Sequence, residues 1–321
     1  GTESDRGVLI RQPPLAPSLN EVRRTFKWPA LSTYQALFYA MIPALLWERY
    51  GGVRLHCRKV INSVGEWTES KVLQTLKSFI TGDHRAVPSE LHVLMNAVDS
   101  GKLRWIPFYF VDVLDACRSI PGDVGDLRAS ICAIQEMLDV FSSQFNRHTE
   151  HVWEGLFVMA LLIRLLTKQT DNPLLDPIQQ MRATFSVSYN SHWAQPQRGP
   201  SFHAAATVKH LIDGLQIPDK LPHVAVFSPP HARFQTYNVV LVAYPNEAIS
   251  DRIIVGYELK EGNAIPKTRA PDAVASSFII RGLIRGRTAQ PPALERSNWR
   301  VPSDADIDSF LGETGRQLAP K

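Results

Sequence analysis

The chain has 321 residues, of which 44% are hydrophobic and 21% are charged, so it can bury a sizeable core and can form more than one domain. Because no apolar run approaches the roughly 18 residues of a membrane-spanning helix, we expect a soluble globular protein with no membrane partner. The 35 basic residues are nearly offset by 31 acidic ones, and a net charge of +4 is compatible with a nucleic-acid partner without requiring one.

The chain is predicted to begin with an extended segment. Residues 1–29 carry four prolines and scattered charges without periodicity, which indicates little regular structure. Residues 31–50 have apolar side chains at helical spacing, and Pro43 is expected to kink this helix. Residues 52–61 alternate briefly between polar and apolar, which is typical of a strand.

The rest of the first half is predicted to be helical. Residues 66–82 place four apolar side chains on one face and have Gly82 at the end, a typical helix stop. The four apolar residues are Val72, Leu73, Leu76 and Phe79. Three more helical segments, each bounded by Pro or Gly, follow at residues 88–101, 104–120 and 123–145.

The second half is predicted to combine helices with a small sheet. A strongly apolar helix over residues 151–166 is followed by short runs rich in β-branched and aromatic residues. These strand candidates are residues 184–193, 223–228, 237–244 and 252–259. Residues 277–286, SFIIRGLIRG, are predicted to form a further helix. Helix, strands and helix in this order predict an α/β fold.

The last two strand candidates are expected to pair as an antiparallel hairpin around PNEAISD. If Tyr244 pairs with Arg252, Asn238 lies opposite Glu258, and alternation puts both on one face of the sheet. Glu258 and Lys260, two positions apart, also share one face of their strand.

The buried charges of Glu258 and Lys260 leave two interpretations open. Burial of an unpaired carboxylate or ammonium costs several kcal/mol, so the two either form a structural ion pair or take part in a site. In a metal-dependent nuclease, the glutamate of a Glu-x-Lys pair and a second carboxylate from the neighbouring strand bind Mg²⁺. The lysine would then stabilise the attacking hydroxide or the phosphorus centre.

Glu154 is a candidate supporting acid for the same site. It lies at helical spacing with Phe157, Leu161 and Leu165, on the apolar face of its helix, where a carboxylate needs a cation or hydrogen-bond donors. The alternative is an edge position at which the carboxylate reaches water.

Basic residues surround the proposed site in the sequence and form a candidate nucleic-acid-binding cluster. A solvated helix face explains the cluster equally well. Its members are Lys267, Arg269, Arg281, Arg285 and Arg287.

The expected second metal carboxylate is missing. Asn238 occupies the position opposite Glu258, and no Asp or Glu occurs from Ser228 to Tyr244, so a shift of register by two does not supply one. An amide oxygen can bind Mg²⁺ but is neutral, so the affinity should be lower. The fold could therefore persist with weak or no hydrolysis.

Four segments of the chain resemble the Crinkler effector proteins of oomycetes and fungi and, more distantly, the retrotransposon hot spot proteins of trypanosomes. The resemblance covers roughly residues 100–321 and contains no short diagnostic motif. The segments are RWIPFYFVDVLDACRSI, HVWEGLFVMALLIRLL, IIVGYELKEGNAIP and NWRVPSDADIDSFLGETGRQLAP.

The resemblance implies three parts. The lead-in over residues 1–29 precedes a helical region over residues 30–120, which would be the tail of a degenerate ATPase region. Residues 121–321 would form a PD-(D/E)xK nuclease-like domain, a restriction-endonuclease-like mixed sheet flanked by helices. The chain has neither a GxxxxGK[ST] motif nor a secretion signal, so we expect a C-terminal fragment of a longer protein.

The resemblance also implies a function. Crinklers are secreted by the microbe and act as virulence factors in the host nucleus. Glu154, Glu258 and Lys260 match the catalytic positions, and Mg²⁺ would be held by Glu258 and Asn238. The expected substrate is nucleic acid, and DNA is favoured over RNA. The alternative is an inactive pseudo-nuclease that binds DNA or a host nuclear protein and perturbs transcription or defence.

Overall fold

The structure is a computed structural model of the whole chain. It describes residues 52–97, 103–122, 124–143, 150–190, 215–228, 237–261, 276–282 and 299–318. The predicted lead-in over residues 1–29 and the predicted helix over residues 31–50 lie outside these ranges. Within them, no helix combines the length and apolar character that a membrane crossing needs.

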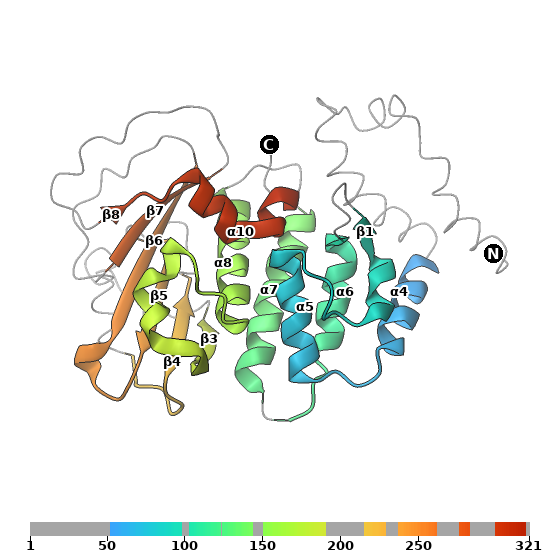
Figure 1. Cartoon of the computed structure of the whole chain (residues 1–321), viewed down its shortest axis with the longest axis horizontal. Coiled ribbons are helices and arrows are strands. Elements are labelled where there is room, and N and C mark those ends of the chain that lie inside the picture. Colours follow the sequence, from blue (N-terminus) through green and yellow to red (C-terminus); the bar gives the residue numbers. More distant parts are fainter. Residues whose placement is uncertain are drawn as a thin grey trace, which may run out of the picture.

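The fold is mixed α/β, with helices beside one another on one side of a sheet (Figure 1). A last helix passes over the end of this layer (Figure 1). The helices are α4 (Gly52–Ser63), α5 (Glu69–Thr81), α6 (Pro107–Cys117), α7 (Gly125–Ser143), α8 (Glu150–Leu166) and α10 (Asp304–Leu318). The 3-10 helices are η1 (Ser89–Leu94), η2 (Pro173–Thr184) and η3 (Ile249–Asp251). A small antiparallel pair, β1 (Met95–Ala97) and β2 (Leu103–Trp105), lies among the helices.

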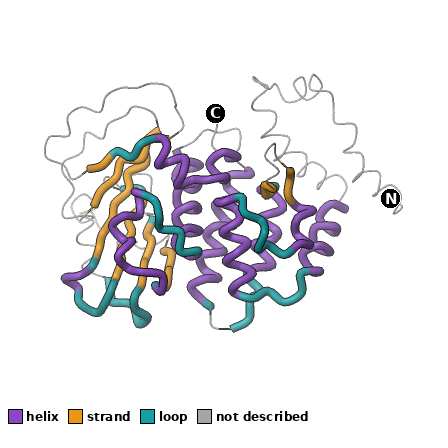
Figure 2. The backbone as a smooth tube through the Cα atoms, in the orientation of Figure 1, coloured by secondary structure: helices purple, strands orange, loops and turns teal. Residues whose placement is uncertain are grey.

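The main sheet has six strands in sequential order, seen as the orange layer of Figure 2. They are β3 (Ser186–Asn190), β4 (His223–Phe227), β5 (Val239–Tyr244), β6 (Ile253–Glu261), β7 (Ser276–Gly282) and β8 (Trp299–Arg300). β5 runs antiparallel to both of its neighbours, β4 and β6, while β3 is parallel to β4, and β7 and β8 continue parallel to β6. The carboxyl ends of β3, β4, β6 and β7 therefore meet the start of β5 at one end of the sheet.

The sheet is buried on both faces. Alternate side chains, such as Val226, Leu241 and Tyr257, belong to a core shared with the helices. The opposite face forms a second apolar cluster. Its buried members are Ala225, Phe227, Tyr237, Val240, Val242 and Tyr244. Burial on both faces explains why β4 and β5 are continuous apolar runs in the sequence.

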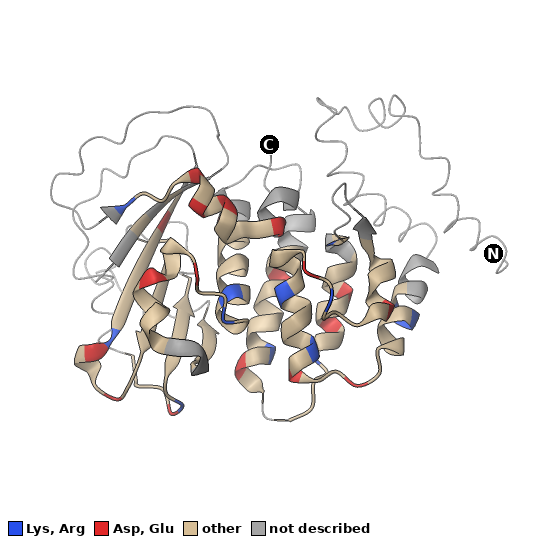
Figure 3. Ribbon diagram, viewed as in Figure 1, with Lys and Arg blue, Asp and Glu red and all other residues tan. Residues whose placement is uncertain are grey.

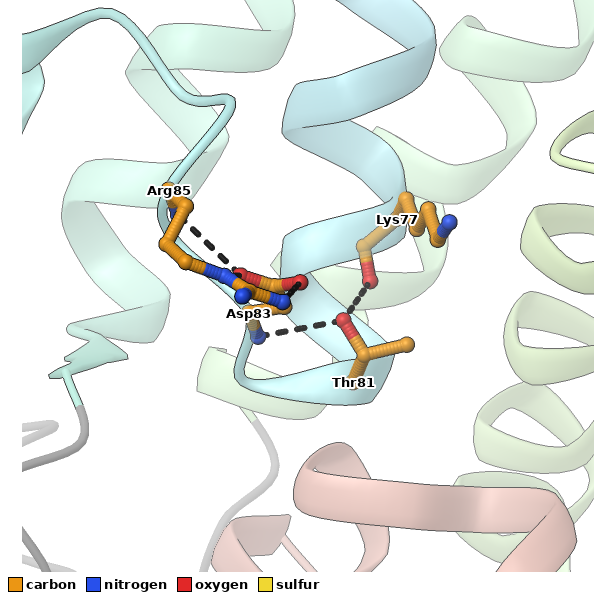
Figure 4. Close-up of polar contacts among 4 residues, drawn as sticks. All are labelled: Lys77, Thr81, Asp83 and Arg85. Carbon is orange, nitrogen blue, oxygen red and sulfur yellow. Dashed lines mark hydrogen bonds and ion pairs between the residues drawn. The ribbon is translucent and has the colours of Figure 1, made fainter.

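Helix α5 follows the predicted pattern closely. Val72, Leu76 and Phe79 are buried, and Gly82 ends the helix at φ 68°, a conformation that glycine adopts without strain. Beyond Gly82, the Asp83 carboxylate accepts two hydrogen bonds from the Arg85 guanidinium at 2.9 and 2.7 Å (Figure 4). These bonds hold the pKa of Asp83 well below its ordinary value. Because the Arg85 side chain is 83% exposed, the pair shapes the loop more than it stabilises the fold.

Helix α8 is the centre of the molecule. Every residue from Leu156 to Leu166 is buried, because this helix packs on α5 and α7 and also contacts β3 and β6. Its buried cation, Arg164, donates from Nε to the Phe310 carbonyl oxygen at 2.6 Å and from Nη2 to the Ser309 carbonyl oxygen. Those carbonyls belong to the last turn of α10 before Gly312, where φ 58° and ψ −144° interrupt the helix. Arg164 therefore caps the first part of α10.

Three of the predicted elements are wrong. Residues 52–61, predicted as a strand, belong to helix α4, because Cys57 and Ile61 turn into the helical core. Residues 277–286, predicted as a helix, begin with strand β7, because Phe278 and Ile280 face the core at a spacing of two. Residues 88–101 contain η1 and β1 in place of the expected helix, and residues 104–120 begin with β2 before α6.

The predicted boundary between residues 120 and 121 lies between two helices, α6 and α7, that pack against each other. One core cluster contains side chains from α4 to α10. The division into two domains stays a prediction.

We expect Gly312→Ala to destabilise the protein by about 3 kcal/mol or more, because two effects add. An alanine is strained at positive φ by about 1 kcal/mol, and its Cβ would lie 2.4 Å from the Ile80 carbonyl oxygen. Gly65→Ala is the matched control, since Gly65 has φ 73° but no atom within 4 Å of the place that a methyl group would take, and should cost only about 1 kcal/mol. Urea unfolding of both variants measures the difference, and equal losses would contradict the packing argument.

Candidate functional site at the strand ends

The predicted site residues lie at the end of the sheet where the strand termini meet. Glu154 is in the second turn of α8, Asn238 immediately precedes β5, and Glu258 and Lys260 are on β6. Arg281 is on β7, not on a helix, and the register aligns it with Lys260. The remaining basic residues, Lys267, Arg269, Arg285 and Arg287, lie outside the described ranges.

The predicted register of the hairpin is confirmed. Val239 pairs with Tyr257 and Ala243 with Ile253, which is the predicted register over these residues, although the pairing does not include Asn238 and Glu258. The Asn238 backbone N–H donates at 2.9 Å to the carbonyl oxygen of Tyr257, the residue that already pairs with Val239, so the regular pairing ends at Val239 and the backbone at Asn238 is irregular.

The Asn238 side chain joins two elements. Its Oδ1 accepts a hydrogen bond from the Leu259 backbone N–H at 2.7 Å, and its Nδ2 donates to Glu154 Oε1 at 2.5 Å. The amide thus extends the pairing of β5 with β6 and at the same time holds the carboxylate of α8. Both polar ends of Asn238 are engaged, which fixes its orientation.

Glu258 is only 6% exposed. Val255, Tyr257 and Leu259 face the core shared with α8, so regular alternation directs Glu258 to the other face, with Gly256 and Ile254. The structure therefore brings Glu154 and Asn238 together on the α8 side. We expected the Asn238 and Glu258 side chains to project from the same face of the sheet. This is wrong for Asn238, whose side chain points toward α8.

Tyr237 explains this change of direction. Its ring lies against Gly256, where a Cβ would meet the ring at 2.2 Å, and it belongs to the second apolar cluster. Because Tyr237 is on that face, the chain at residues 237–238 departs from strand alternation and Asn238 points toward α8. A glycine inside an apolar strand was the signal in the sequence for such a close approach.

A second polar pair at the same end of the sheet was missed by the sequence analysis. Tyr189 at the end of β3 and Ser228 after β4 share a hydrogen bond of 2.6 Å between their hydroxyl oxygens. Burial raises the pKa of Tyr189, so its hydroxyl stays protonated near neutral pH. The two residues are isolated in apolar runs, and no spacing in the sequence marks them.

The arrangement does not fit the predicted magnesium site. Among the described residues, no three His, Cys, Asp or Glu side chains are grouped closely enough to hold a metal ion. Where the second carboxylate was expected, the side-chain N–H of Asn238 instead presents a partial positive charge to Glu154, in place of a cation. An aspartate there would set two carboxylates at hydrogen-bond distance, which requires a shared proton or a bound cation.

Charges elsewhere on the described chain do not form a single-sign surface in the view of Figure 3. Acidic and basic residues are interspersed along the helices, and the start of α10 is acidic, with Asp304 and Asp306 in its first turn. An electrostatic footprint for nucleic acid would depend on the cluster around β7.

Comparison of the chain with protein-family models, with curated proteins and with solved structures found no match. The relationship to Crinkler proteins that we expect from the quoted segments stays a prediction.

We expect Asn238→Ala to lower the free energy of unfolding by about 2 kcal/mol, because it removes two hydrogen bonds at a partly buried site, one of them to a carboxylate. Asn246→Ala is the matched control. Asn246 likewise accepts from a backbone N–H, of Ala248, and donates to a carboxylate, of Asp251, but it is exposed. Its loss should be below about 1 kcal/mol. Similar small losses in both variants would show that Asn238 does not hold the site together.

Proposed function

We propose that the chain is a nuclease-like module of Crinkler type that binds DNA without cleaving it, in the nucleus of a host cell to which a microbe delivers it. One observation supports the absence of DNA cleavage in this proposal. The Asn238 amide donates to Glu154 where a metal-dependent nuclease would have a carboxylate and a cation.

The order of elements supports the nuclease-like part of the proposal. Helix α8 precedes the antiparallel strands β4, β5 and β6, and β7 returns parallel to β6. A mixed sheet of this kind is compatible with the restriction-endonuclease-like fold that the Crinkler resemblance implies.

Metal-dependent hydrolysis is the second candidate, and a different observation favours it. Glu258 is buried on a central strand, with Lys260 two positions later and Arg281 beside Lys260 in the register. In this alternative Glu258 holds Mg²⁺ without Asn238, whose amide is turned toward α8, and Lys260 stabilises charge at the phosphate.

A plasmid-nicking assay with Mg²⁺ and with Mn²⁺ separates the two candidates. We expect the natural chain to nick no faster than Glu258→Gln or Lys260→Met. Asn238→Asp should acquire a Mn²⁺-dependent rise in melting temperature, because a cation relieves the repulsion between Asp and Glu154 and stabilises the folded state by mass action. Asn246→Asp places a carboxylate beside Asp251 in the same way, but at an exposed position where water screens the repulsion, so its rise should be much smaller. Nicking by the natural chain that is lost in Glu258→Gln would overturn the binding-only proposal and establish hydrolysis.

DNA binding is tested separately by fluorescence anisotropy with a labelled 20-base-pair duplex over a range of salt concentrations. Four basic residues that flank β7 in the sequence are replaced by Gln: Lys267, Arg269, Arg285 and Arg287. We expect weaker binding and a slope of log K against log salt that is smaller by about 0.9 for each phosphate that the variant no longer neutralises.

A control with the same change in net charge replaces four exposed basic residues of the helical half. They are Arg58, Lys59, Arg85 and Arg118. This variant should bind nearly as the natural chain does. Equal effects of the two sets, or no effect of either, would contradict a DNA-binding surface at β7 and leave a host protein as the partner.

A further inference from the structure

Another polar cluster lies at the end of the sheet opposite to the candidate site, at the start of β3. His223, the first residue of β4, pairs in register with Ser186 and is only 5% exposed. Its Nδ1 is 2.6 Å from Ser186 Oγ, and its Nε2 is 2.7 Å from Ser188 Oγ. Both ring nitrogens therefore bond to hydroxyls of the neighbouring strand. β3 is an edge strand, and β4 is its neighbour in the sheet.

A lysine holds the chain immediately before β3. Lys168, just past the end of α8, donates from Nζ to the Phe185 carbonyl oxygen, and the ammonium lies 3.7 Å from the centre of the Phe185 ring. Lys168 has φ 57°, a conformation unusual for a residue other than glycine. Burial lowers the pKa of Lys168 to about 8. We refer to Lys168, Ser186, Ser188 and His223 together as the β3 clamp.

The β3 clamp suits a neutral imidazole. A neutral ring has one N–H donor and one acceptor nitrogen, and two hydroxyls can complete both bonds in either tautomer. Protonation makes both nitrogens donors, so both serine oxygens must accept and must direct their own protons elsewhere. Ser186 Oγ has the Pro222 carbonyl oxygen within 3.4 Å for this purpose. The added charge would lie on a face formed by apolar side chains such as Ala225 and Phe227.

The charged groups around His223 do not offset the cost of burying that added charge. Lys168, from the end of α8, has the same sign and disfavours it, while Asp126, in the first turn of α7, favours it. Tyr244, opposite His223 on β5, keeps its proton because burial raises its pKa. Glu69 on α5 acts on Lys168 and favours its charged form. Burial is the largest influence on His223, and it lowers the pKa of this histidine.

We propose that the β3 clamp is a pH-sensitive device in which protonation of His223 separates the start of β3 from β4. The open form lets the imidazolium reach water and increases its distance from Lys168. The consequence is an exposed edge on β4, whose backbone groups can then pair with another strand. Because the folded form prefers the neutral ring, stability of the β3–β4 pairing is complete above the pKa of a free imidazole and decreases as the pH falls below it.

Hydrogen exchange of the full chain, measured at pH 7.5 and pH 5.0 and corrected for intrinsic exchange, tests the proposal. Amides of residues 186–190 should lose protection at pH 5.0 relative to amides of residues 239–244 in β5. This loss of protection can be at most roughly 30-fold. That is the factor by which protonation of a free imidazole, with a pKa of about 6.5, favours the open state between pH 7.5 and pH 5.0. Unchanged relative protection would overturn the proposal.

Two variants identify the titrating group. His223→Asn should remove the pH response of residues 186–190, whereas His92→Asn, at a histidine in η1 far from β3 in the sequence, should leave it intact. A response that persists in folded His223→Asn would overturn the proposal. If His223→Asn does not fold, the ring carbons of His223 are titrated by NMR in the natural chain. Because the closed form prefers the neutral ring, this titration must have its midpoint below the pKa of a free imidazole, about 6.5, and a midpoint at or above that value would again overturn the proposal.

Discussion

The burial of α8 is the constraint on which the structure depends. A helix surrounded by apolar neighbours can contain charged side chains only where other elements supply partners. Glu154, near its start, receives the amide of Asn238, and Arg164, near its end, donates to two carbonyls of α10. These contacts join the central helix to the sheet at one end and to the last helix at the other. The position of the candidate site therefore follows from the need to satisfy a carboxylate.

The same contact limits the chemistry of the site. An amide offers a carboxylate a hydrogen bond and no net charge, so the Glu154–Asn238 pair needs neither a proton nor a metal ion to be stable. A carboxylate at position 238 would need one or the other. A single nitrogen atom in place of an oxygen thus distinguishes a carboxylate that the protein itself satisfies from one that could hold a cation beside it.

The sequence predicts the elements whose spacing is regular over many residues, such as α5, α8 and the β5–β6 hairpin with its register. It fails for α4 and β7, because short apolar runs fit a helix or a strand, and tertiary contacts with η1, α6 and β6 decide between them. Glu154, Asn238 and Glu258 are all recognisable as candidates. Their mutual geometry is not, because the irregular backbone at Tyr237 and Asn238 depends on the ring of Tyr237 covering Gly256. The His223 contacts depend equally on a parallel pairing between distant strands.

The last helix has a consequence for the order in which the chain can fold during synthesis. Beyond the break at Gly312, Glu313 pairs with Arg104 at 2.7 Å, across 209 positions of sequence. The helices before residue 120 emerge from a ribosome long before α10, and the surface of α5 that α10 covers must wait, exposed to water, until α10 has been synthesised. Contacts of such long range slow folding, and a nascent chain with an uncovered apolar surface is a natural client for chaperones.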